Sequence, residues 1–110
     1  RVALAAKPQL RGERMLEYHA KLMEVRGRVN GERAKAIAKE MGLDMVRLEK
    51  DLESAEVSGA IHENVALGDK LGIVGTPAFV IGDEIVSGAV GAEPLRQAIA
   101  NVRACGKAAC

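Results

Sequence analysis

The chain has 110 residues, a length that suits one domain able to bury a real core. Hydrophobic residues make up 48% and aromatic residues only 2%, so the core must consist mainly of Leu, Val, Ile, Ala and Met. The formal net charge of +1 gives no electrostatic reason to expect a nucleic acid or an anionic membrane as a partner. No apolar run approaches the roughly 20 residues that a membrane-spanning helix needs.

The first quarter of the chain is predicted to form two helices. Residues 1–6 have the pattern of the end of a helix, which Lys7-Pro8 should stop because a residue before proline avoids the α region. A second helix is predicted from Glu13 to Val25. Its expected apolar face carries Met15, Leu16, His19, Leu22 and Met23. We therefore interpret His19 as a packed histidine and not as a catalytic or metal-binding one.

Three further helices are predicted before residue 73. Asn30 is an N-cap candidate for a helix that runs to Met41, with Gly42 able to end it in the left-handed conformation. Asp44 should cap the next helix, and either Ser54 or Ser58 should begin the last of the three. The expected inner faces are Ala34, Ile37, Ala38 and Met41; Met45, Leu48 and Leu52; and Val57, Ile61, Val65, Gly68 and Leu71.

A β-hairpin is predicted for residues 79–86. Phe79–Ile81 and Glu84–Val86 flank Gly82-Asp83, a pair that suits a tight hairpin turn. This turn would pair Phe79 with Val86, Val80 with Ile85 and Ile81 with Glu84, which makes both faces of the hairpin apolar. Such a hairpin needs cover on both faces and more strands beside it, and the rest of the sequence does not obviously supply them.

A last helix is predicted from about Ala92 to Ala104, with Pro94 tolerated in its first turn. Leu95, Ala98, Ile99 and Val102 should face the core. Because domains consist of packed layers of helices and sheets, we expect the helices to cover a small sheet.

Two features could carry chemistry, and the residues alone leave both open. Cys105 and Cys110, in the tail CGKAAC, could be a small disulfide, two free thiols or a reactive pair. The end of a helix disfavours a thiolate at Cys105, which argues against reactivity. Thr76-Pro77 precedes the first strand, where the proline could be an ordinary trans residue or a cis one.

The common sequence motifs for catalysis or cofactor binding are missing. The sequence has no phosphate-cradling glycine loop, no serine nucleophile elbow, no His-Glu-x-x-His and no Cys-x-x-Cys. His19 and His62 with the two cysteines match no common zinc spacing. We therefore expect no metal and no cofactor.

The stretch LGIVGTPAFVIGDEIVSGAVG resembles the cis-proline region and last hairpin of DsbA-like thiol:disulfide oxidoreductases, which have a thioredoxin fold. The segments EYHAKLM, AIAKEMGLD and SAEVSGAIHENVALGDKLGI resemble that family's inserted helical domain and occur in the same order. The resemblance covers roughly Arg1 to Val102. It implies an α/β class with a partial thioredoxin-like fold. The implied parts are a helical insertion domain at 1–72, a C-terminal ββα part at 73–104, and a cysteine-containing tail at 105–110.

The resemblance also implies a site and a reaction. Pro77 corresponds to the cis-proline, and Thr76 to the residue whose backbone pairs with an extended substrate peptide by strand addition. The family's catalytic Cys-x-x-Cys lies upstream of this region, in a βαβ part that the 110 residues do not contain. Cys105 and Cys110 do not match the catalytic positions. We therefore expect a C-terminal portion of the family fold that is inactive alone.

The expected parent is a protein-disulfide oxidoreductase of the periplasm or another exported location, although no signal peptide is present in this chain. A chain that begins at Arg1 without a Met also predicts a processed or cut start. The expected partners are extended segments of client proteins and a redox partner protein.

Two other functions are weighed against this one. A non-catalytic binding or assembly module would form a homo-oligomer through the exposed hairpin edge. A helical nucleic-acid binder would use Arg26, Arg28 and Arg33, but acidic residues balance these charges and the chain has too few aromatics to stack bases.

Overall fold

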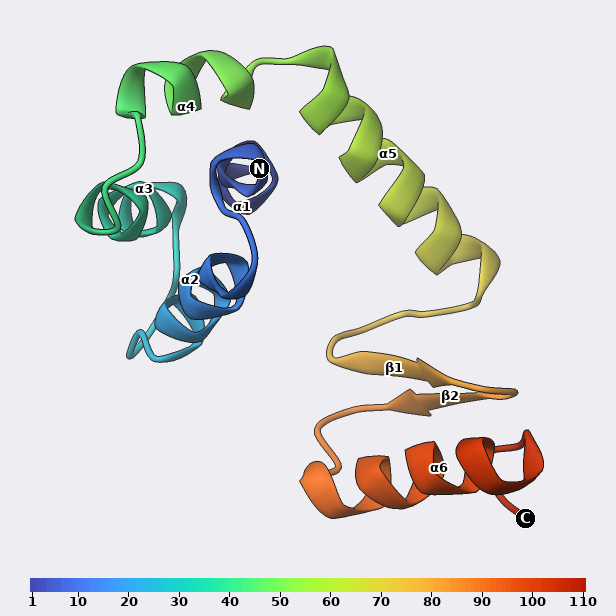
Figure 1. Ribbon diagram of the computed structural model, residues 1–110. Coiled ribbons are helices and arrows are strands. Elements are labelled where there is room, and N and C mark those ends of the chain that lie inside the picture. Colours follow the sequence, from blue (N-terminus) through green and yellow to red (C-terminus); the bar gives the residue numbers. More distant parts are fainter. The chain divides into compact units, whose positions relative to one another are not determined.

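The computed structural model describes residues 1–110 as two compact units, Arg1–Asn64 and Val65–Cys110. Figure 1 shows the elements along the chain. They are α1 (Val2–Ala6), η1 (Lys7–Gln9), α2 (Glu13–Met23), α3 (Gly31–Glu40), α4 (Met45–Leu52), α5 (Ala55–Lys70), β1 (Ala78–Ile81), β2 (Glu84–Ser87) and α6 (Ala92–Cys105). No helix is both long and apolar enough to cross a membrane.

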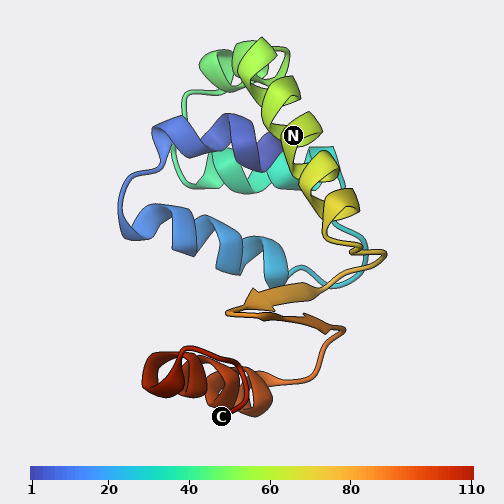
Figure 2. The same cartoon turned by 90° about the vertical axis from the view of Figure 1, so that its right-hand side faces the viewer.

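The core of the first unit forms around the short helix α1. This helix lies against α3 and α4, and α2 lies against α3 (Figures 1 and 2). A five-residue helix is marginal by itself, so α1 depends on this packing. Ala5 and Ala6 are fully buried, and their small side chains let the neighbouring helices approach closely. The buried set is Val2, Ala5, Ala6, Leu10, Tyr18, Ala34, Ile37, Ala38, Met41, Leu43, Leu48, Leu52 and Val57.

The predicted helix caps are confirmed. Asn30, Asp44 and Ser54 each accept a hydrogen bond from the backbone N–H three residues later, at 2.9, 3.1 and 3.2 Å. Ser54, and not Ser58, therefore begins α5. Gly42 has a φ of +81° and ends α3 as predicted, with the N–H of Leu43 bonded to the carbonyl of Ala38 at 3.2 Å.

The predicted end of the first α-helix before Lys7-Pro8 is confirmed, since α1 ends at Ala6, but the reason given for it is wrong. Lys7 has φ −49° and ψ −44°, which is the α conformation, and the chain continues through Pro8 as a 3₁₀ turn. The turn tolerates Pro8 because proline stands in its first positions, where no backbone N–H is needed. The N–H of Leu10 bonds to the carbonyl of Lys7 at 3.0 Å, and the chain becomes extended at Leu10.

The predicted inner face of α2 is also wrong for part of its residues. Leu16 and Met23 are 69% and 67% exposed, and His19 is exposed and not packed. Tyr18 is fully buried instead, and its hydroxyl donates to the carbonyl of Ala34 at 2.8 Å. A tyrosine can be buried when its hydroxyl finds such a partner, and this bond turns α2 so that Tyr18 faces inward.

Burial raises the pKa of the Tyr18 phenol above its usual value. Above about pH 10 the unfolded chain loses this proton while the folded chain keeps it, so stability should fall as pH rises further. The chain has one Tyr and no Trp, so the phenolate absorbance reports Tyr18 directly. We expect Tyr18→Phe to remove this part of the alkaline destabilisation. Identical pH profiles for the two proteins would contradict the assignment.

The helix α5 is packed along only part of its predicted face. Val57 is buried and Ile61 half-buried in the first unit, whereas Val65 is 59% exposed and Leu71 is 39% exposed. The predicted stripe on this helix is therefore correct for its first half only.

The second unit contains the hairpin and α6. The predicted register is confirmed, with Phe79 opposite Val86, Val80 opposite Ile85 and Ile81 opposite Glu84. The helix α6 packs against β1. The sheet has two strands, and its other face stays open, since Val80 is 56% and Ile85 40% exposed.

On α6 itself, Ala98 is buried and Leu95 and Val102 are half-buried. Ile99 is 41% exposed, so its predicted core position is wrong.

Candidate functional site

The candidate site begins where α5 ends. Gly72 has a φ of +73°, and the N–H of Ile73 bonds to the carbonyl of Gly68 at 2.9 Å, which closes the last turn of the helix. The chain then leaves as an exposed loop, in which the side chain of Val74 is fully exposed. This loop leads directly into β1.

Thr76 and Pro77 form the end of the loop, and the peptide bond between them is cis. The carbonyl of Pro77 accepts a hydrogen bond from the N–H of Gly88 at 2.9 Å, which continues the hairpin ladder one step beyond the two strands. The N–H and carbonyl of Thr76 have no hydrogen-bond partner in the chain. Both residues are exposed. Thr76 therefore offers an unpaired donor and acceptor at the start of β1.

The free edge of β1 extends this unpaired backbone. β1 pairs with β2 alone, so the outer edge of β1 carries N–H and carbonyl groups without partners. An edge of this kind can bind an extended peptide through main-chain hydrogen bonds. Neither Thr76 nor Pro77 has a titratable side chain, so the chemistry this site can offer is binding.

The two cysteines lie elsewhere in the second unit. Cys105 is the last residue of α6, and its sulfur is bonded to that of Cys110 across a sequence separation of 5. Of the alternatives left open by the sequence, the structure therefore has the disulfide. The bond leaves neither cysteine free to act as a thiolate ligand. No group of three or more His, Cys, Asp or Glu lies close enough to hold a metal.

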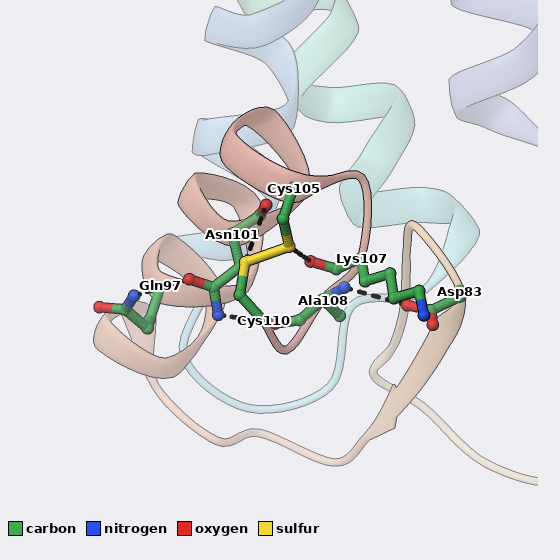
Figure 3. Close-up of a disulfide and its surroundings, with 7 residues drawn as sticks. All are labelled: Asp83, Gln97, Asn101, Cys105, Lys107, Ala108 and Cys110. Carbon is green, nitrogen blue, oxygen red and sulfur yellow. Dashed lines mark hydrogen bonds between the residues drawn. A yellow bond between two sulfur atoms is a disulfide. The ribbon is translucent and has the colours of Figure 1, made fainter.

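Sequence reasoning missed the contacts that hold the tail. Ala108 is only 5% exposed, and Asp83 and Asn101 bond to its backbone (Figure 3). The sulfur of Cys110 lies 3.5 Å from the carbonyl oxygen of Asn101, a contact only, since a bonded sulfur has no proton to donate. The one signal in the sequence was Asp83, a residue that often bonds to backbone groups from a turn.

The three arginines considered for nucleic-acid binding lie together. Arg26, Arg28 and Arg33 line an open cavity of about 700 Å³ at the α2–α3 connection. Glu24 and Glu32 line the same cavity, so acidic groups stand beside the basic ones.

The chain matches the model of the DSBA-like thioredoxin domain over residues 1–100. It therefore belongs to this family, and the predicted resemblance is confirmed. A search of the curated proteins finds no match.

A solved structure gives the same result for the fold. The chain is similar to a thioredoxin-like oxidoreductase from Silicibacter pomeroyi DSS-3, with a TM-score of 0.83 and 38% sequence identity. The match covers 94% of this chain and 58% of that one, so this chain spans about 58% of the length of its relative. The predicted thioredoxin-like class, with helices, a β-hairpin and a C-terminal helix, is confirmed.

Proposed function

We propose that this chain carries the peptide-binding part of a thiol:disulfide oxidoreductase that acts on protein disulfides. Membership of the DSBA-like family and the likeness to a thioredoxin-like oxidoreductase support the reaction class. The observation that carries the proposal is the unpaired backbone of Thr76 beside the free edge of β1. Extended client segments would bind there, with little demand on their sequence.

The reaction needs two thiols that these 110 residues do not offer in the family arrangement. The chain has no Cys-x-x-Cys, and its two cysteines are bonded to each other at the end of α6. Exchange would pass through a thiolate and a mixed disulfide, supplied by a Cys-x-x-Cys outside this chain. We therefore expect this chain alone to show no turnover in an insulin-reduction assay, and robust turnover would contradict the proposal.

The proposed location is the periplasm or another oxidising, exported compartment. Disulfides form and persist in such compartments, and the bond between Cys105 and Cys110 supports this choice. A redox partner protein of the same compartment would then reset the oxidoreductase.

Removal of the Thr76 N–H should weaken peptide binding. The ligand is an unfolded, carboxamidomethylated insulin B chain, and the readout is the chemical shift of the backbone amides around β1. A lost main-chain hydrogen bond, with its partner left unpaired, should raise Kd roughly tenfold in Thr76→Pro.

Thr76→Val is the matched control for this experiment, because it keeps the N–H and nearly the same side-chain shape. We expect its Kd to stay within about twofold of the parent value, since a main-chain site does not read the hydroxyl. Equal weakening in both variants would mean that the side chain is recognised. Shifts confined to residues outside the 74–88 region would place the peptide elsewhere.

The open face of the hairpin favours a second candidate, a self-associating module without catalysis. Val80 and Ile85 are both exposed on that face, next to the free edge of β1. Two chains could pair these edges about a two-fold axis. Light scattering over a concentration series distinguishes the candidates, because a monomer at all concentrations would contradict self-association.

A further inference from the structure

The C-terminal residues fold back onto the turn of the hairpin (Figure 3). The N–H of Ala108 donates to Oδ1 of Asp83 at 3.0 Å, and its carbonyl accepts from Nδ2 of Asn101 at 2.8 Å. Both backbone groups of Ala108 are thus satisfied by side chains, one from the turn between β1 and β2 and one from α6. Ala108 is 5% exposed, although it lies near the end of the chain.

The surroundings of Ala108 are arranged for this contact. Nε2 of Gln97 donates to Oδ1 of Asn101 at 3.0 Å, which turns the amide nitrogen of Asn101 toward the tail. Gly106 has a φ of +80° and reverses the chain at the end of α6, where its N–H bonds to the carbonyl of Val102 at 2.9 Å. The C-terminal loop, residues 106–110, then closes on Cys105 with a Cα–Cα distance of 6.1 Å.

We propose that the Cys105–Cys110 disulfide is a redox-released clamp, which holds the C-terminal loop on the hairpin turn until a dithiol reduces it. The reactant is a dithiol reductant. Its thiolate attacks one sulfur of the pair, the S–S bond breaks, and the other sulfur leaves as a thiolate that takes up a proton. The second thiol of the reductant then resolves the mixed disulfide. Two electrons pass to the cysteine pair, and the reductant becomes a disulfide.

Two observations and one physical argument support a clamp over a passive tail. Both cysteines are exposed, so a reductant can reach them. The contacts that the ring holds are few, namely two hydrogen bonds and one buried methyl group, and they must offset the entropy of ordering the loop. Closing a ring of this length removes part of that entropy from the free loop, which favours docking roughly 30-fold.

The position of Cys105 suits a clamp and not an oxidising pair. The C-terminal end of a helix carries the negative end of the helix dipole, which disfavours a thiolate there. The dipole of α6 therefore does not stabilise the reduced form. In an oxidising compartment the disulfide is the resting state. The clamp shares the oxidising compartment with the proposed function but not its binding site, since the hairpin turn lies at the opposite end of the strands from Thr76.

Amide exchange of Ala108 tests the clamp in the full chain. We expect its N–H to exchange roughly 30-fold faster after reduction with dithiothreitol, and equally fast in the double variant Cys105→Ser/Cys110→Ser. The amides of β1 and β2 show whether the hairpin stays folded in each sample. An unchanged exchange rate of Ala108, both in the reduced protein and in the double variant, would overturn the proposal.

A second experiment uses the reciprocity of the coupling. If the disulfide favours loop docking, then loop docking favours the disulfide by the same factor. Asp83→Ala should therefore shift the cysteine pair toward the reduced form about fivefold in a series of reduced and oxidised dithiothreitol ratios, read by alkylation and mass spectrometry. Asp83→Asn keeps an acceptor oxygen for Ala108 and should stay within about twofold of the parent.

Glu93→Ala is the control for the loss of a carboxylate from the same unit. Glu93 lies in the first turn of α6, where its carboxylate pairs with Arg96 at 3.2 Å and does not contact the C-terminal loop. The variant Glu93→Ala should leave the reduction equilibrium of the cysteine pair unchanged. Equal shifts in Asp83→Ala and Glu93→Ala would overturn the proposal, because they would reflect net charge and not the clamp.

Discussion

Replacing Leu48 with alanine is expected to lower the free energy of unfolding of the first unit by about 2–5 kcal/mol. Leu48 lies on α4 with 0% of its side chain exposed, and it is one of the two largest fully buried side chains, with Tyr18. The loss combines the transfer energy of the removed methyl groups with the cavity that they leave. A unit of this size is stable by only about 3–10 kcal/mol, so the change removes a large share of its stability.

Urea denaturation measures this effect, with the fluorescence of Tyr18 as a probe confined to the first unit. The midpoint should fall while the slope of the unfolding free energy against urea stays the same. Val46→Ala is the matched control, because Val46 lies on the same helix with 84% of its surface exposed. It should change stability by no more than about 0.5 kcal/mol. Equal losses in the two variants would contradict the burial of Leu48.

Replacing Gly82 with alanine is expected to destabilise the second unit by about 2–5 kcal/mol. Gly82 has a φ of +59°, a conformation that costs other residues about 1–2 kcal/mol. An added Cβ would also lie 2.7 Å from Cγ2 of Val102 on α6. Because valine is stiff about χ1, Val102 cannot rotate freely away, and overpacking of this kind costs about 1–3 kcal/mol.

Two comparisons separate the terms at Gly82. Gly88 has a φ of +89° and nothing within 4 Å of an added Cβ, so Gly88→Ala should show the conformational cost alone. Adding Val102→Ala to Gly82→Ala should relieve the clash, which a double-mutant cycle would report as a favourable coupling. Amide exchange in β1 and β2 measures stability in each variant. If Gly82→Ala costs no more than Gly88→Ala, the close approach of the turn to α6 is wrong.

The hairpin and the helix caps could be predicted because they depend on short stretches of sequence. A two-residue turn at Gly82-Asp83 sets the register of every pair in the ladder, and the observed pairs are the predicted ones. Asn30 and Asp44 cap their helices through bonds to residues three positions away. Neither feature needs knowledge of a distant residue.

The orientation of α2 could not be predicted in the same way. Two overlapping faces of this helix are apolar enough to pack, one centred on Leu16, His19 and Met23 and the other on Tyr18. The choice depends on the carbonyl of Ala34, which is 16 positions along the chain and accepts the Tyr18 hydroxyl. Periodicity does not reveal a long-range hydrogen bond, so the prediction was right for Met15 and Leu22, which pack against the core, and wrong for Leu16, His19 and Met23.

For the candidate site, the sequence singled out Thr76 and Pro77, and with them Cys105 and Cys110. The family resemblance supplied the roles of Thr76 and Pro77. For Cys105 and Cys110 the residues left a disulfide, free thiols and a reactive pair as alternatives. The tertiary structure added the unpaired backbone of Thr76, the bond between the two cysteines, and the contacts of the tail. These depend on which groups meet in space.

The sequence by itself determined the order of the elements, the hairpin register, the caps and the family, because local spacing and turn chemistry are written in consecutive residues. Only the tertiary structure decided which face of α2 is buried, and which face of the hairpin stays open. It also decided that Ala108 lies between Asp83 and Asn101. Those outcomes depend on hydrogen bonds and packing between residues far apart in the chain, where composition and periodicity carry no information about the partner.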